Sequence, residues 1–522
     1  MPIASIELPH DLESLRALAL RQQAQLQARD AQILLLEEYL RLLKHYRFGR
    51  TSEQVPDGQI ALFNEAEAAM EAAEREESEG VAVSAHTRAP RGRRPLPAWI
   101  PRVEIVHDLP EAEKVCANDG TKLTRIGEEI LEQLEWIPAK VRVLRHVRPK
   151  YACPSCHEGV HVAPPPAQPI PKSLASPALL AHVATSKYAD GLPLYRLESV
   201  LARAGIELPR STLSHWMIRC GELVQPLCNL MREELLATGL VQCDETRFPV
   251  LKEPGKAPTS HAYLWTLRAP ERPLVSYEYD PSRSGQVPLR LLEGFQGVLQ
   301  TDGYEGYGAV GALPGIVHVG CWAHARRKFV EALEAQGGKK KPPAKDSIAG
   351  QGLDFLQKLY ALERKTQGAS AQERTQHRQQ HAKPLLEQLR KWLDLSRPKV
   401  PPQSLTGKAL AYLAGQWPKL ERVLDDGRIP LDTNLVENAI RPFVVGRKGW
   451  LFADTVRGAQ ASANLYSLVE TAKAHELEPF AYLRQIFAEL PRATTLEQVE
   501  ALLPRRIDRE LLQDPRQNAS SE

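Results

Sequence analysis

The sequence predicts a multidomain α+β protein, and three observations support this fold class. A chain of 522 residues is too long for one compact core. Heptad-like spacing near the N-terminus is followed, after two linkers and a cysteine-bearing segment, by a strand-rich pattern between residues 239 and 320. Apolar spacings typical of helices then fill residues 350 to 425.

Composition sets the outer limits of the interpretation. The chain is 43% hydrophobic and 25% charged, with a net charge of +3, which is ordinary for a globular protein. No apolar run reaches the ~20 residues that span a bilayer, and the N-terminus lacks a secretory pattern, so we expect no membrane association. Only Cys153 and Cys156 are closely paired among seven cysteines, which favours reduced thiols and a cytoplasmic, nucleoid-associated protein.

Residues 1–50 are predicted to contain one long helix, over residues 11 to 46. Positions spaced alternately by four and three form a heptad seam: Leu15, Ala19, Gln22, Leu26, Arg29, Ile33, Leu36, Leu40 and Leu43. The seam predicts a coiled coil that joins protomers into a homo-oligomer. The alternative is an amphipathic helix that packs on its own chain.

Residues 51–101 form a linker that is first acidic (65 to 79) and then basic (88 to 101). In the basic part, Arg91, Arg93 and Arg94 resemble a minor-groove hook, in which an extended Arg-Gly-Arg lies along narrow A·T-rich DNA. A solvated linker is the alternative.

Residues 102–165 are predicted to form a zinc-ribbon-like DNA-binding module. Cys153 and Cys156 have the spacing of a zinc knuckle, and the strand-like segment 141–149 leads into them. The upstream partner has Cys116 but Asp119 where a second thiolate is expected. Asp119, His157 or His107 could complete a Zn²⁺ site, and a ribbon that has lost its metal is the alternative.

Residues 166–235 are predicted to be helical and to include a helix-turn-helix. An apolar helix over 194–204 ends at Gly205, and a second helix starts near Arg210, Ser211 and Thr212, which we expect to cap it and to face DNA. Many helical hairpins share this outline without binding DNA.

The following residues predict an RNase H-like catalytic domain in two parts, 236–335 and 429–485. We expect strands at 239–244, 261–268, 273–279, 297–302 and 315–320, with a helix over 285–294. Three strands, a helix and a further strand is the order of that fold. Residues 336–428, with helices near 352–367, 372–394 and 406–420, are expected to form a helical insertion, and 486–522 a C-terminal tail.

Three acids carry the predicted chemistry. Asp244 and Asp302 are each expected where a strand ends, and Glu437 on a helix. Phosphoryl transfer at DNA needs two Mg²⁺ (or Mn²⁺) ions about 4 Å apart, and a few carboxylates suffice to hold them. The negative charge of the DNA phosphates would be balanced by nearby basic side chains: Arg326, Arg327, Lys328, Arg441, Arg447 and Lys448.

Other interpretations of these residues stay open. Glu245 could replace Asp244 as the ligand, although a strand would point it to the opposite face. Glu437 could close a capping box with Asn434 or pair with Arg441, and Asp432 is a rival third acid. Pro442 is expected to kink or end the helix. His318 and His324 flank Cys321 and suggest either a second metal or, as we prefer, a strand-to-helix turn.

Long motifs throughout the chain resemble the transposases of the insertion-sequence-66 family. They are Phe48-Gly-Arg-Thr-Ser-Glu53, Arg91-Gly-Arg-Arg-Pro-Leu-Pro97, Arg145-His-Val-Arg-Pro-Lys-Tyr-Ala-Cys153, Thr301-Asp-Gly-Tyr-Glu-Gly-Tyr307, Gly320-Cys-Trp-Ala-His-Ala-Arg-Arg-Lys-Phe329, Glu437-Asn-Ala-Ile-Arg-Pro442, Gly446-Arg-Lys-Gly-Trp-Leu-Phe452 and Tyr466-Ser-Leu-Val-Glu-Thr-Ala-Lys473.

The resemblance implies a DDE triad, which falls on Asp244, Asp302 and Glu437. It also implies action on DNA at the terminal inverted repeats of an element and at target DNA, with accessory proteins of the same element. The expected function is cleavage and strand transfer. The rivals are a catalytically retired DNA-binding protein or repressor and, less favoured, a nonspecific nuclease. Asp119 departs from the family's cysteine pattern.

Overall fold

The computed structural model describes residues 165–257, 260–336 and 347–512, with parts of 11–33 and of 143–162. The chain divides into two compact units, one of residues 1–71 with 148–522 and one of residues 72–147; the elements below belong to the first. The described positions between residues 13 and 33 are helical. Two sets of predicted site residues lie outside the described residues: Arg91, Arg93 and Arg94, and Cys116, Asp119, Cys153 and Cys156.

A short antiparallel hairpin pairs β1 (Lys150–Ala152) with β2 (Val160–Val162). The strand predicted over 141–149 is wrong for the described residues 143–148, which are irregular. Val143 and Val147 are exposed.

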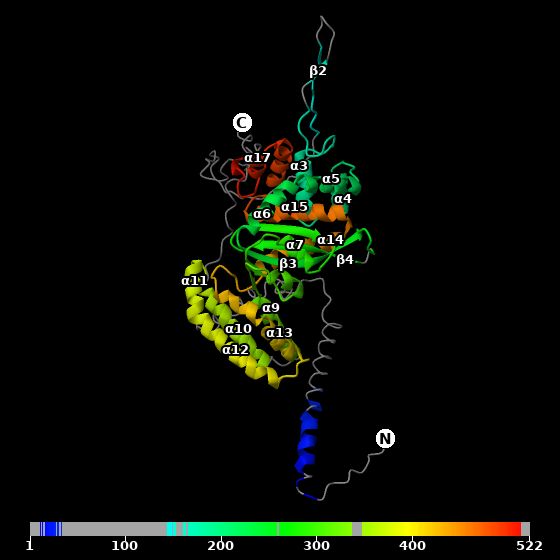
Figure 1. Ribbon diagram of the computed structural model, residues 1–522. Helices are drawn as coiled ribbons and strands as arrows, with labels where there is room; N and C mark the ends of the chain where they lie inside the picture. Colours follow the sequence, from blue (N-terminus) through cyan, green and yellow to red (C-terminus); the bar gives the residue numbers. More distant parts are fainter. Residues whose placement is uncertain are drawn as a thin grey trace, which may run out of the picture. The chain divides into compact units, whose positions relative to one another are not determined.

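A mixed sheet in the order β5-β4-β3-β6-β7 forms the centre of the first unit (Figure 1). Its strands are β3 (Leu240–Lys252), β4 (His261–Ala269), β5 (Leu274–Asp280), β6 (Gly297–Gln300) and β7 (Ile316–Val319), with α7 (Gln286–Leu291) between β5 and β6. The first three strands are antiparallel, and β6 and β7 run parallel to β3. This topology is consistent with an RNase H-like core.

The predicted end of β3 at residue 244 is wrong, because the strand continues to Lys252. Its antiparallel ladder with β4 runs on to Pro249, and β8 (Ala453–Thr455) pairs with Val250 and Lys252. Polar residues from 244 to 247 resemble a turn in sequence, yet neighbouring strands hold them in extended conformation.

Helices pack on both sides of the sheet (Figure 1). Before it come α3 (Pro177–Tyr188), α4 (Leu194–Arg203), α5 (Arg210–Leu223) and α6 (Gln225–Leu236). After it come α14 (Asn434–Trp450), α15 (Val456–Ala474), α16 (Pro479–Glu489) and α17 (Leu496–Glu500). On α15, Ser467 and Thr471 accept the backbone N–H groups of Tyr277 and Val275, which satisfies donors of β5.

The predicted helical pair at 194–223 exists, but its capping does not. Gly205 adopts a left-handed φ of 81° after α4. Pro209, not Ser211 or Thr212, precedes the first residue of α5, and no side chain caps the helix. One side of α5 packs closely on α15, since a Cβ at Gly221 would lie 2.4 Å from the Ala461 Cβ.

Between β7 and α14 lies a group of helices with a core of its own. It comprises α9 (Trp322–Gln336), α10 (Ile348–Arg364), α11 (Ala371–His377), α12 (Lys383–Ser396) and α13 (Leu405–Leu420). Leu240 and Val298 bury into this core, whereas Val241 and Leu299 bury into the main one. Because successive side chains of a strand point to opposite faces, one face of β3 and β6 contributes to the core of the helical group and the other face to the main core.

Two boundaries differ from prediction. Pro442 lies inside α14, which continues to Trp450; buried Phe443 packs on Phe248 of β3, and this packing outweighs the lost backbone hydrogen bond. The boundary expected at 485 falls inside α16, and Leu502, Leu503 and Ile507 join the main core. None of the described helices has the length and apolar character of a membrane span.

Candidate active site

The two aspartates lie at the same end of a parallel strand pair. The pairing of β3 with β6 ends where Gln242 aligns with Gln300. Asp244 and Asp302 each follow by two residues, so both carboxylates emerge where the shared ladder stops. Beyond this point β3 pairs with β4 on its other side, with Asp244 opposite Thr266.

Two buried glutamines connect this strand end to the start of α14. The Gln242 Nε2 donates to the Gln300 Oε1 at 2.8 Å and to the Asp432 carbonyl at 2.8 Å. The Gln242 Oε1 accepts from the Val436 N–H at 3.2 Å, and the Gln300 Nε2 donates to the Pro430 carbonyl at 2.8 Å. Sequence reasoning missed these residues, although each glutamine stands two positions before an aspartate.

Glu437 enters from the first turn of α14 and is buried. Its Oε1 accepts from the Thr433 hydroxyl at 3.1 Å and lies 3.8 Å from the His324 Nδ1. Its Oε2 lies 3.6 Å from an Arg327 nitrogen. The capping-box alternative is wrong, because Thr433 precedes the helix and Asn434 is its first residue.

The three acids form one electrostatic group. Burial raises the pKa of the Asp244 carboxyl well above its usual range. The carboxylates of Glu245, Asp302 and Glu437 raise it further, because ionising a second acid nearby costs energy. One oxygen of each aspartate accepts a backbone N–H, from Glu245 to Asp244 at 2.8 Å and from Tyr304 to Asp302 at 2.9 Å.

Asp432, the rival third acid, is engaged in the surrounding structure. Its Oδ2 accepts from the Tyr360 hydroxyl at 2.9 Å, and its Oδ1 accepts from the Asn434 N–H at 3.2 Å. These contacts secure the turn that leads into α14. Glu437 is the acid that this turn directs towards Asp244.

Glu245 lies on the opposite face of β3. Its carboxylate accepts from Arg283 at 2.6 Å and from the Tyr307 hydroxyl at 2.5 Å. Burial raises the pKa of Glu245, while the hydrogen bonds from Tyr307 and Arg283 lower it. Arg283 also stacks on the Tyr304 ring at 4.0 Å, so this group braces the loop that carries Asp302.

Cys321, His324 and Glu437 offer ligand atoms within 4.8 Å of one another, whereas the second metal considered from sequence had His318 and His324 on either side of Cys321. Burial raises the pKa of the Cys321 thiol to about 12, and its sulfur accepts from the Thr433 N–H and hydroxyl. A protonated, hydrogen-bonded thiol is a poor ligand for a hard cation. His318 instead contacts the Thr301 hydroxyl at 2.8 Å, and burial lowers its pKa to about 4.

Among the described residues, those predicted to contact DNA lie on three helices. Arg326, Arg327 and Lys328 lie on α9, of which Arg326 is buried. Arg441, Arg447 and Lys448 lie on α14, where Lys448 is exposed. Arg210 and Ser211 are exposed at the start of α5, and Thr212 is half-buried. Of these residues, Arg327 lies 3.6 Å from Glu437, whereas Arg447 and Lys448 are in the last turn of α14, at the other end from Glu437.

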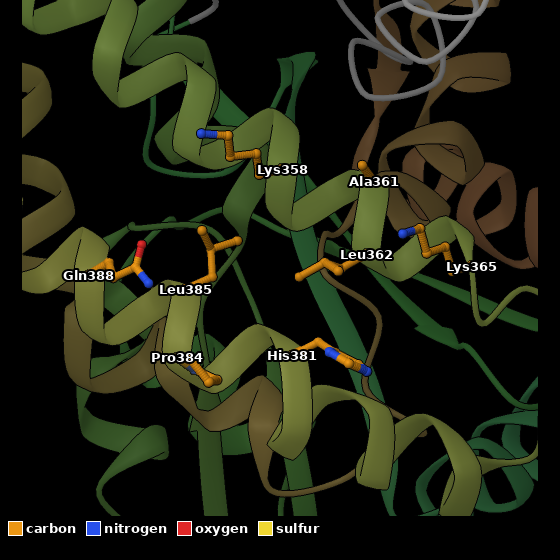
Figure 2. A pocket seen from close by; sticks show the side chains of 8 residues that line it. All are labelled: Lys358, Ala361, Leu362, Lys365, His381, Pro384, Leu385 and Gln388. Atoms are coloured by element: carbon orange, nitrogen blue, oxygen red, sulfur yellow. The ribbon is translucent and has the colours of Figure 1, made fainter.

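A pocket of about 400 Å³ opens between α10 and α12 (Figure 2). It is lined by Lys358, Ala361, Leu362, Lys365, His381, Pro384, Leu385 and Gln388. None of the predicted site residues lines it. The acids therefore define the candidate site better than concavity does.

Four family models match this chain. Residues 172–461 match the transposase IS66 family, and residues 467–504 match the IS66 C-terminal element. Residues 113–157 match the zinc-finger binding domain of transposase IS66, and residues 35–105 match a model described as transposase C of IS166 homeodomain.

Three relatives come from Sinorhizobium fredii, and all are described as uncharacterized. The protein y4qI is 33% identical over 97% of this chain and 98% of its own length. The protein y4jD is 36% identical over 78% of this chain and 81% of its own length, and y4hP is 30% identical over 88% and 85%. No solved structure matches this chain.

The chain belongs to the IS66 family of DDE transposases. It combines the family's transposase, zinc-finger, leucine-zipper-like and C-terminal regions.

Proposed function

We propose that this transposase binds the terminal inverted repeats of its element and cleaves and joins DNA by two-metal phosphoryl transfer at Asp244, Asp302 and Glu437. One observation carries the proposal: Asp244 and Asp302 each follow by two residues the last aligned pair of the parallel strands β3 and β6, and Gln242 joins this strand end to the turn and first residues of α14, which carries Glu437. A folded chain tolerates such a group of acids best when a cation balances it.

The residues present fit divalent cations. Among the described residues, neither Asp244 nor Asp302 has an ion pair, and the second oxygen of each carboxylate accepts no hydrogen bond. These oxygens are hard donors of the kind that Mg²⁺ prefers. When bound, the ions would activate the attacking oxygen and stabilise the leaving oxygen.

The surrounding side chains hold Glu437 in place. The Thr433 hydroxyl donates a hydrogen bond to its Oε1. The His324 Nδ1 lies 3.8 Å from the same oxygen, and an Arg327 nitrogen lies 3.6 Å from its Oε2. Burial lowers the pKa of His324, which favours a neutral ring. Arg327 would also offset part of the charge of a DNA phosphate, as cations do at phosphoryl-transfer sites.

DNA contacts are proposed for the basic side chains of α9 and α14 and for those of the more distant hook and α5. Arg327 has the most direct link to the site, since one of its nitrogens lies 3.6 Å from the Glu437 Oε2. Each phosphate contact should make affinity more sensitive to salt. The corresponding set is Arg91, Arg93, Arg94, Arg210, Ser211, Thr212, Arg326, Arg327, Lys328, Arg441, Arg447 and Lys448.

The N-terminal helix is proposed to join protomers. Leu26 and Ile33, on the predicted seam, are 60% and 54% exposed, which leaves an apolar face for a second copy. Removing residues 1–46 should lower the mass seen by light scattering, and an unchanged mass would contradict this role.

Zinc is proposed for the finger region, held by Cys116, Cys153, Cys156 and Asp119. Three thiolates and a carboxylate are acceptable Zn²⁺ donors. Metal analysis should find zinc in the wild type and lose it in Cys153→Ser. Zinc-free wild type would indicate a ribbon that keeps its fold without metal.

The function is tested by transposition of a marked mini-element in cells, with the neighbouring accessory genes supplied. We expect movement with the wild type and none with Asp302→Asn, because the substitution removes a carboxylate that would bind the metal ions needed for the reaction. Binding to element ends, measured by gel shift, should stay within about twofold. Asp454→Asn is the matched control, since Asp454 is an exposed partner of Lys252.

The alternatives give different outcomes. End binding without movement by the wild type would favour a retired DNA-binding protein. Loss of end binding in Asp302→Asn would show that this residue contacts DNA or supports the fold instead.

A further inference from the structure

Helix α13 has two faces, one apolar and one polar. Its apolar side is buried in the core of the helical group through Leu410, Leu413 and Trp417. Tyr412, Gln416 and Lys419 are spaced by four and three residues and therefore share a second face.

Tyr412 lies directly on the loop that carries Asp302. A Cβ on Gly303 would be 2.7 Å from the tyrosine Cε2 and 2.8 Å from its hydroxyl oxygen. The phenol also interacts electrostatically with Asp302, Cys321 and Arg327. A phenol is a hydrogen-bond donor at neutral pH, yet among the described residues the Tyr412 hydroxyl has no hydrogen-bond partner.

Gln416 and Lys419 continue this pattern along the helix. The Gln416 amide oxygen is buried and, within the described part of the chain, has no hydrogen-bond partner. Lys419 interacts electrostatically with Asp302 but has no ion pair among the described residues. With His318 and Arg422 it lines an open pocket of about 370 Å³.

Polar groups left without partners in a folded protein are costly unless a ligand satisfies them. The Tyr412 hydroxyl and the Lys419 ammonium group are donors that match successive non-bridging oxygens of a nucleic-acid backbone, whereas the Gln416 oxygen is an acceptor and does not. Asp302 lies beside these two donors, so they extend from the proposed reaction centre.

We propose that Tyr412 and Lys419 of α13 bind the DNA strand whose scissile phosphate lies at Asp302, with the Tyr412 hydroxyl donating to a non-bridging oxygen of that phosphate. This inference rests on the proposed function. It gives the helical group between β7 and α14 a direct part in holding substrate.

The test is single-turnover cleavage of element ends by the full-length protein with its accessory proteins. The scissile phosphate is an ordinary phosphate or either phosphorothioate diastereomer, and Mn²⁺ is the cofactor because it accepts sulfur better than Mg²⁺ does. Tyr412→Phe should slow cleavage of ordinary DNA about tenfold, the usual effect of losing one hydrogen bond. Tyr195→Phe, which alters an exposed tyrosine on α4, should cleave as the wild type does.

The sulfur effect separates contact from structural support. One diastereomer should slow the wild type more than it slows Tyr412→Phe, since the variant has no hydrogen bond to lose. Lys419→Gln should weaken binding and its salt dependence. Equal sulfur effects in wild type and Tyr412→Phe would overturn the inference, while failure of the wild type to cleave any substrate would overturn the proposed function itself.

Discussion

Two adjacent residues of β3, Asp244 and Glu245, carry carboxylates on opposite faces of the strand, and the charges around them differ. Glu245 is held by Arg283 and Tyr307. Asp244 faces Asp302 and Glu437, and burial with those neighbours raises its pKa. Both residues are partly buried, but within the described residues only Glu245 of these two acids has an ion pair.

This difference separates a structural acid from a functional one. A carboxylate with a cation and a hydroxyl contributes to the fold, whereas a group of unbalanced acids reduces stability until a cation binds. Strand alternation makes the contrast possible, because neighbouring residues reach different surroundings.

The largest expected effect comes from Asp244→Asn. Cleavage of element ends should fall by about a thousandfold or more, because the amide is a weaker ligand for Mg²⁺. In metal-free buffer at neutral pH, the free energy of unfolding should instead rise, by on the order of 1 kcal/mol, since an uncompensated buried charge is removed. Quenched-flow or gel assays and urea denaturation measure the two. A variant that is both inactive and less stable would contradict the comparison.

Glu245→Gln should have the reverse profile. The free energy of unfolding should fall by roughly 1–2 kcal/mol, a modest loss because Arg283 is partly exposed and water can screen it. Activity at a temperature where the variant is folded should fall less than about tenfold, because Glu245 only braces the Asp302 loop. A loss of activity as large as that of Asp244→Asn would assign Glu245 to the reaction.

Much of the fold could be predicted from sequence, since the strands at 261–269 and 274–280 follow clear patterns. The extension of β3 to Lys252 could not, because pairing with β4 and β8 overrides its polar residues. Pro442 was expected to kink or end the helix, and only the ending is wrong, because packing of Phe443 on Phe248 helps to retain the helix beyond the proline. Tyr412 could not be predicted as a site residue, because the sequence around it does not indicate that α13 lies against Gly303.

The site was predicted as three separate acids, and their roles stay predictions. Their grouping depends on long-range contacts, above all those of Gln242 and Gln300 with the turn at residues 430–436. The repeated spacing of glutamine two residues before aspartate was the available signal.

The most direct measurement is Mn²⁺ binding, by electron paramagnetic resonance, to wild type, Asp244→Asn and Glu245→Gln bound to an element end. A metal site at Asp244, Asp302 and Glu437 predicts that Asp244→Asn weakens binding about tenfold or more, while Glu245→Gln binds within about twofold of wild type. Equal binding by all three proteins would contradict a cation site on this face of β3.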